Sequence, residues 1–181
     1  MSSAAHTDVR PGPWALLAHP WVPAALVIVG TGALVAAFAA EHWGGLPPCE
    51  LCLWQRWAYA AAIGLLMPGM FVKDRPRARA LILGMGAVAF LAGAGIAFFH
   101  AGVEQGWWQG LTGCTNAAAG ATSVEDLLRQ LEAAPIARCD EIPWSFLGLS
   151  MAGWNVPAML GLAAIAALAA RATARLSGRA A

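Results

Sequence analysis

Charged side chains are scarce in this chain. Only 12% of its 181 residues are Asp, Glu, Lys or Arg, whereas an ordinary soluble domain carries roughly 25%. In addition, 59% of the residues are hydrophobic, and the mean hydropathy is +0.60. A net charge of +1 provides no overall basic field that would attract nucleic acid. The composition therefore predicts an integral membrane protein that forms a single domain over residues 1–181.

Two further absences narrow the chemistry of the cysteines. The motif Cys49-Glu50-Leu51-Cys52 is followed by Leu53, where attachment of c-type haem would need histidine. The chain has no second Cys-x-x-Cys motif, which disfavours a zinc site built from its four cysteines. No second histidine is suitably spaced to join His100. We therefore predict no metal site.

Long apolar runs are abundant. A transmembrane helix needs about 20 consecutive apolar residues, and four stretches approach or reach that length, with Arg56 as the one Asp, Glu, Lys or Arg inside them. We predict an all-α membrane protein with a bundle of four transmembrane helices at about 22–40, 53–72, 80–99 and 151–170.

The basic residues predict the orientation of this bundle, because cytoplasmic segments carry an excess of Lys and Arg. Eight of the eleven lie at the N-terminus, between the second and third segments, or at the C-terminus: Arg10, Lys73, Arg75, Arg77, Arg79, Arg171, Arg175 and Arg179. The other three are Arg56, Arg129 and Arg138. Both termini are therefore predicted to be cytoplasmic, with residues 44–52 and the long loop 101–150 outside.

The long outer loop contains one helical pattern, at Ser123–Ala134, with an apolar stripe and a terminating proline. This amphipathic helix either covers the bundle or lies on the membrane surface. Cys114 and Cys139 flank it, and all four cysteines fall on the outer side, where disulfides persist. Four cysteines allow three pairings, and adjacency favours Cys49 with Cys52.

The Cys49–Cys52 motif lies at the mouth of the second segment, where Pro47-Pro48 favours a helix start. The positive end of a helix dipole stabilises a thiolate, and the thiolate is the attacking species in disulfide exchange. A closed structural disulfide is the plainer interpretation.

Arg56 and His100 are the other candidate site residues. Arg56 lies one helical turn beyond Cys52 on the same face, so it could stabilise a sulfur anion and donate hydrogen bonds to a quinone carbonyl. It could instead be an anchor whose charge reaches the membrane surface. His100 ends the third segment on the outer side, where a histidine is also a common interface residue.

These residues resemble the disulfide bond formation protein B (DsbB) family of membrane thiol oxidases. The resemblance covers essentially the whole chain. It includes the Pro-Cys-x-x-Cys motif, Arg56, the segment His100–Glu104, the two loop cysteines, and the closing segment 144–151.

The resemblance implies a quinone-dependent oxidase of the bacterial inner membrane. Its Cys114–Cys139 pair would meet a periplasmic DsbA-type thiol oxidoreductase, and its Cys49–Cys52 pair would reduce ubiquinone or menaquinone from the membrane pool. Arg56 and His100 would bind the quinone. The alternative from a different class is a non-enzymatic membrane subunit with two structural disulfides.

Overall fold

The computed structural model of the protein describes residues 13–110, 123–125, 128 and 137–179. Three of its helices are long and apolar enough to cross a membrane: α2, α4 and α7, the last over its residues 151–178. The elements in chain order are α1 (Pro13–Leu17), α2 (Val22–His42), α3 (Glu50–Leu66), the 3-10 helix η1 (Met67–Met70), α4 (Pro76–Glu104), β1 (Ser145–Phe146), β2 (Leu149–Ser150) and α7 (Met151–Arg179).

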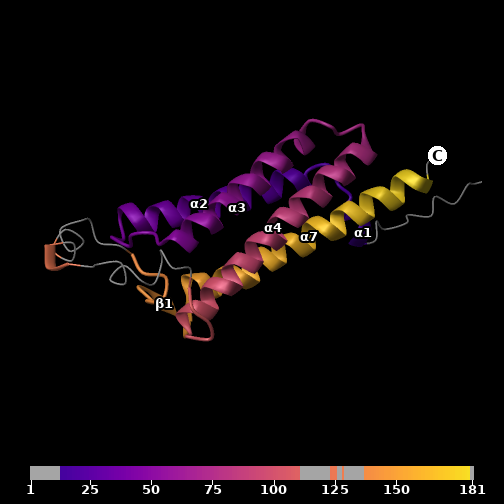
Figure 1. Cartoon of the computed structure of the whole chain (residues 1–181). Coiled ribbons are helices and arrows are strands. Elements are labelled where there is room, and N and C mark those ends of the chain that lie inside the picture. The colour runs from indigo at the N-terminus through magenta and orange to yellow at the C-terminus, as the bar shows by residue number, and fades with distance from the viewer. Residues whose placement is uncertain (1–12, 111–122, 126–127, 129–136, 180–181) are drawn as a thin grey trace, which may run out of the picture.

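The long helices form an elongated bundle (Figure 1). Helix α4 packs most extensively against α7 and next against α3, and α3 packs against α2. The β1–β2 hairpin lies at one end of the bundle, while α1 and the C-terminal turns of α7 lie at the other. This arrangement brings the start of α3, the end of α4 and the start of α7 to the same end.

The second predicted segment differs most from the structure. Its α-helix begins at Glu50 and ends at Leu66, and η1 completes it to Met70. Pro68 supplies no backbone N–H and disfavours continuation of the α-helix. At 17 residues α3 is shorter than α2, α4 and α7. It is not among the three helices that are long and apolar enough to span a membrane in the described part of the chain.

The third and fourth segments extend further than their apolar runs. Helix α4 begins at Pro76, where the missing N–H costs nothing, and it includes residues 101–104, which we had predicted as loop. It ends in a Schellman motif: Gly106 adopts φ +70°, its N–H donates to Val103, and the N–H of Trp107 donates to Gly102. Helix α7 continues to Arg179. A charged side chain ends an apolar run in the sequence, but it does not interrupt the backbone hydrogen bonds of the helix, so both helices continue past their apolar segments.

The closing part of the outer loop forms a hairpin that we did not predict. Strands β1 and β2 pair antiparallel, with Ser145 opposite Ser150. Leu147 and Gly148 both have positive φ, as a two-residue type I′ turn requires.

Of the predicted helix Ser123–Ala134, the residues at 124, 125 and 128 are helical, and most of the rest lies outside the described residues.

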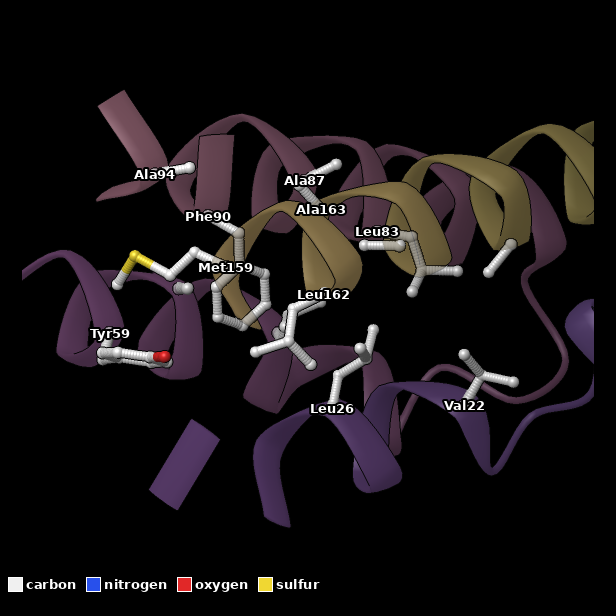
Figure 2. Close-up of a cluster of buried hydrophobic side chains, with 14 residues drawn as sticks. Val22, Leu26, Tyr59, Leu83, Ala87, Phe90, Ala94, Met159, Leu162 and Ala163 are labelled. Atoms are coloured by element: carbon white, nitrogen blue, oxygen red, sulfur yellow. The ribbon is translucent and has the colours of Figure 1, made fainter. Parts of the chain in front are cut away.

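The main core lies between α2, α3, α4 and α7, where large side chains interdigitate with small ones (Figure 2). Phe90 and Met159 are fully buried at its centre. At Gly93 an added Cβ would lie 2.5 Å from the sulfur of Met159 and 2.9 Å from the Cβ of Ala58. Small residues therefore allow α3, α4 and α7 to approach one another closely, as is usual for membrane bundles.

Candidate functional site

The start of α3 places two thiols at a helix N-terminus. Cys49 is the N-cap residue, in an extended conformation, and its sulfur accepts a hydrogen bond from the backbone N–H of Cys52 at 3.3 Å. The helix dipole and this N–H both favour negative charge on the sulfur. The sequence prediction that a helix begins at this motif is confirmed.

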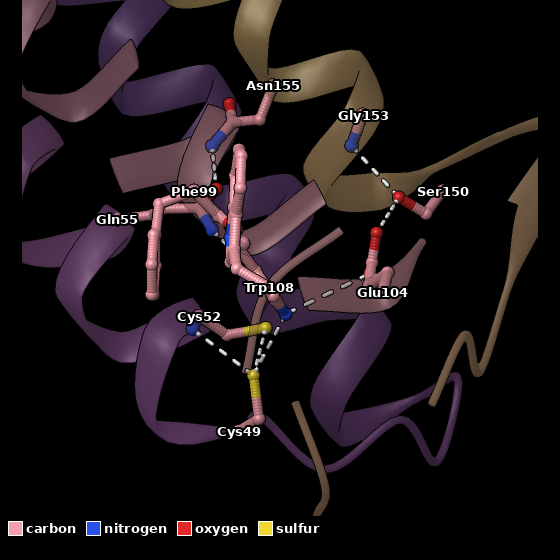
Figure 3. A network of polar contacts seen from close by, with 10 residues as sticks. Cys49, Cys52, Gln55, Phe99, Glu104, Trp108, Ser150, Gly153 and Asn155 are labelled. Carbon is pink, nitrogen blue, oxygen red and sulfur yellow. Dashed lines mark hydrogen bonds and ion pairs between the residues drawn. The ribbon is translucent and has the colours of Figure 1, made fainter. Parts of the chain in front are cut away.

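The two thiols contact each other. The Cys49 thiol donates to the sulfur of Cys52 across 3.1 Å, and both cysteines are free (Figure 3). Both precede the apolar run that begins at Leu53. Their hydrogen bond lowers the pKa of Cys52, with a smaller contribution from the charge of Arg56. The same bond, together with burial, raises the pKa of Cys49. Cys52 is therefore the thiol that ionises first.

His100 lies beside this pair. Its ring is buried, with Nε2 3.5 Å from the Cys49 sulfur and Nδ1 2.9 Å from the amide nitrogen of Gln55. The last turn of α4 thus faces the first turn of α3. Glu104, one turn further along α4, has a carboxylate oxygen 3.9 Å from Nε2. His100 belongs to the dithiol site by geometry.

Cys139 also lies at this site. It is fully buried and disulfide-bonded, and it belongs to the same buried cluster as Cys49, Leu51 and Val103. The backbone of Cys139 is within hydrogen-bonding reach of the His100 ring. The fourth predicted cysteine, Cys114, lies outside the described residues.

Arg56 turns toward α2. Its guanidinium forms an ion pair with Glu41, donates to the carbonyl oxygen of Ala37 at 3.3 Å, and lies 4.8 Å from the centroid of the Phe38 ring. The sequence placed Arg56 near the Cys52 sulfur but did not identify Glu41 as its partner. The signal was present, because Glu41 is the acidic residue immediately after the first apolar run.

Sequence reasoning also missed the polar side chains that support His100. Gln55 is buried and receives a hydrogen bond from the amide of Asn155 at 2.6 Å, and the hydroxyl of Tyr59 donates to Asn155 at 2.7 Å (Figure 3 shows Gln55 and Asn155). On a separate branch, Ser150 caps α7 by accepting from Gly153 N–H and donates to Glu104. A buried amide in an apolar helix needs a partner, and that rule could have singled out Gln55.

A family model described as "Disulfide bond formation protein DsbB" matches residues 19–169. The chain belongs to the DsbB family. Curated relatives named "Disulfide bond formation protein B" support the same family assignment. The protein of Marinobacter nauticus is 34% identical over 75% of this chain and 82% of its own length. That of Hahella chejuensis is 30% identical over 76% of this chain and 85% of its own length. No solved structure matches the chain.

Membership of the DsbB family establishes a membrane protein with an oxidoreductase role in disulfide bond formation. The matched range runs from the residues before α2 well into α7, so it encloses the dithiol, His100, Arg56 and Asn155. The resemblance read from the cysteine motif is thus confirmed at the level of the family.

The absence of a metal site stays a prediction, although this site of the DsbB-family chain holds three possible ligands close together. The ligand atoms of Cys49, Cys52 and His100 lie within 4.8 Å of one another, a grouping that could hold a metal ion. Two sulfurs and an imidazole suit a thiophilic ion. His42 is not part of this group: it is exposed, and its Nδ1 contacts the carbonyl of Phe38 on its own helix.

Proposed function

We propose that this chain is a quinone-dependent oxidase that regenerates the disulfide of a periplasmic DsbA-type protein. Electrons would pass from the partner to Cys114 and Cys139, then to Cys49 and Cys52, and then to membrane quinone. A DsbA-type oxidant has a potential near −120 mV, so its reoxidation needs an acceptor of high potential, and quinone meets that need.

The observation that carries the proposal is the packing of disulfide-bonded Cys139 in one cluster with the free thiol of Cys49. Exchange requires a thiolate to reach a disulfide sulfur. Cys49 also contacts Cys52 at 3.1 Å. Cys49 would therefore exchange with the loop pair, while Cys52, whose pKa is lowered by its hydrogen bond with Cys49, would act toward the quinone.

The proposed cycle balances. Two partner thiols become a disulfide as the loop disulfide is reduced, and the loop dithiol then reduces the Cys49–Cys52 disulfide. Reoxidation of Cys49 and Cys52 to their disulfide releases two electrons and two protons. Quinone, when bound, supplies the chemistry that accepts both.

The residues at Arg56 fit a quinone. The guanidinium has five N–H donors, and its contacts in the described residues use Nη1 and Nη2. Its side chain is 15% exposed, so remaining donors can reach a carbonyl oxygen. Phe38 offers an apolar ring beside it. Arg56 would hold the quinone and stabilise charge on Cys52, and His100 would lie on the Cys49 side.

We further propose that the chain lies in the bacterial inner membrane with both termini cytoplasmic. The excess of basic residues near the start of α4 and the end of α7 supports this orientation. The dithiol end of the bundle would then face the periplasm, where disulfides persist.

The deciding experiment supplies purified protein with a reduced DsbA-type partner and follows quinone absorbance and partner thiols together. We expect one quinone consumed per partner disulfide formed. Cys52→Ser should abolish quinone consumption, while Cys139→Ser should block partner oxidation and still allow the Cys49–Cys52 disulfide to form with quinone. Partner and quinone that both remain unchanged would favour the non-enzymatic subunit with structural disulfides.

A further inference from the structure

A continuous chain of hydrogen bonds leads from Tyr59 on α3, through the half-buried Asn155 on α7, to the Cys49 sulfur. The hydroxyl of Tyr59 contacts Asn155 at 2.7 Å, Asn155 contacts Gln55 at 2.6 Å, and Gln55 contacts Nδ1 of His100 at 2.9 Å. The far ring nitrogen, Nε2, lies 3.5 Å from the sulfur. Tyr59, Gln55 and His100 are each at most 5% exposed, so the described side chains must satisfy one another.

The chain has a direction, because each amide has one donor end and one acceptor end. Tyr59 donates to Oδ1 of Asn155, and Nδ2 of Asn155 donates to Oε1 of Gln55. The amide nitrogen of Gln55 is thereby turned toward His100. A nitrogen that faces a donor must be the bare acceptor, so the imidazole proton is on Nε2.

The opposite direction is disfavoured by Tyr59. If both amides were reversed, Tyr59 would have to accept from Asn155 and its hydroxyl proton would lose its acceptor. Asn155 is the one hydrogen-bond partner of that hydroxyl in the described part of the chain. A buried donor without a partner is costly, so the hydroxyl orients the whole chain.

The groups around Nε2 set what its proton can do. The Cys49 sulfur at 3.5 Å is within hydrogen-bonding distance for sulfur, whereas the nearest oxygen of Glu104 is 3.9 Å away, and that carboxylate already accepts from Ser150. The backbone of Cys139 is another group within hydrogen-bonding reach of the ring. The Cys49 sulfur also accepts from the backbone of Cys52. A proton on Nε2 therefore gives this sulfur a second donor.

We propose that Asn155 and Tyr59 are positioning residues that hold His100 in its Nε2–H tautomer, so that it donates a hydrogen bond to the Cys49 sulfur. The inference rests on the proposed function in one respect: Cys49 must leave a disulfide with the bonding electron pair during exchange. The donor then stabilises the anionic sulfur, and no proton need transfer.

The test uses Asn155→Asp, which preserves shape. An ionised carboxylate only accepts, so Tyr59 and Gln55 must both donate to it. Gln55 would then turn its oxygen toward His100, and the imidazole proton would move to Nδ1. Nitrogen-15 NMR of histidine-labelled protein distinguishes the two tautomers, and His100→Gln identifies the signal among the four histidines. We expect the tautomer to reverse as rising pH ionises the introduced carboxyl.

The same variant should alkylate Cys49 roughly tenfold more slowly at a fixed pH below its midpoint, because a donor to the sulfur anion is lost. Its KM for quinone should not change. Thr173→Val is the matched control on α7, since the Thr173 hydroxyl is buried and has no hydrogen-bond partner among the described residues. It should leave the tautomer and the alkylation rate unchanged.

Tyr59→Phe provides a second route if Asn155→Asp fails to fold. It removes one hydroxyl, and we expect both tautomers to be populated. An Nε2–H signal that persists unchanged in both variants would overturn the proposal. Wild-type protein that shows the Nε2–H tautomer but reduces no quinone would overturn the proposed function instead and leave the positioning role intact.

Discussion

At the residue scale, the two cysteines of one motif are made unlike by their surroundings. Cys49 is buried and gives its thiol hydrogen to Cys52, and its pKa is raised by that bond and by burial. The pKa of Cys52 is lowered by the same bond, and the positive charge of Arg56 adds to the effect. The two cysteines of the motif are chemically identical in the sequence, but in the folded protein Cys52 ionises at a lower pH than Cys49.

This difference predicts the pH dependence of alkylation in the reduced protein. A thiol reacts as its thiolate, so the rate at Cys52 should rise through a midpoint below that of an ordinary cysteine. The rate at Cys49 should rise through a midpoint above it. Iodoacetamide labelling at several pH values, followed by peptide mass spectrometry, measures both. In Cys49→Ala the midpoint of Cys52 should move up, since the donating thiol is gone; coincident midpoints in the wild type would contradict the assignment.

Arg56 gives a second prediction at this scale. Arg56→Lys keeps the charge but loses the planar fork that serves Glu41 and Ala37 together. Hydrogen bonds to charged groups contribute about 1.5–3 kcal/mol, so the KM for quinone should rise roughly tenfold or more. The KM for the protein partner should change little. Steady-state kinetics with each substrate varied in turn measures both constants, and an unchanged quinone KM would return Arg56 to a purely anchoring role.

At the scale of elements, close helix packing depends on which glycines face a neighbour. Helix α4 contains Gly93 and Gly95 two residues apart. An added Cβ at Gly93 would collide with Met159 on α7, while nothing lies within 4 Å of one at Gly95. The two positions therefore separate the effect of packing from the effect of helix propensity.

We expect Gly93→Ala to destabilise the bundle by about 1–3 kcal/mol through overpacking. Gly95→Ala should be neutral or should stabilise by up to about 1 kcal/mol, because alanine is the better helix former. Thermal unfolding in detergent, monitored by circular dichroism, compares the two melting temperatures. Equal melting temperatures would mean that the α4–α7 contact is looser than described.

At the scale of the whole molecule, the cysteines of the site and the basic residues between α3 and α4 lie at opposite ends of the bundle. The dithiol, His100 and Cys139 gather where α3 begins and α4 ends, while Lys73 lies in the turn at the opposite end of these two helices. The buried side chains form two separate clusters: the apolar core, and a smaller cluster at the dithiol end that contains Cys49, Leu51, Val103 and Cys139.

This separation predicts opposite labelling at the two ends. In a cysteine-free background, a membrane-impermeant maleimide applied to intact cells should label Glu50→Cys and not Asp74→Cys, both at exposed positions. Permeabilised cells should label both and serve as the control. The reverse pattern would invert the proposed orientation, and labelling of both positions in intact cells would contradict a spanning bundle.

The sequence by itself determined the membrane class, the approximate positions of the long helices, the helix start at Cys49 and the family. These depend on local composition and on spacing within one element, which helix geometry converts directly into structure. It also placed Arg56 on the side of Cys52, one turn away.

Only the tertiary structure decided which side chains meet at the dithiol. Gln55 and His100 are 45 residues apart, Cys49 and His100 are 51 apart, and Gln55 and Asn155 are 100 apart. Such contacts depend on the rotation and depth of whole helices, which are set by the packing of α3, α4 and α7 around small residues such as Gly93. A residue's own neighbours in sequence carry no record of that rotation, so the contacts of His100 with Gln55 and Cys49 emerged only from the folded chain.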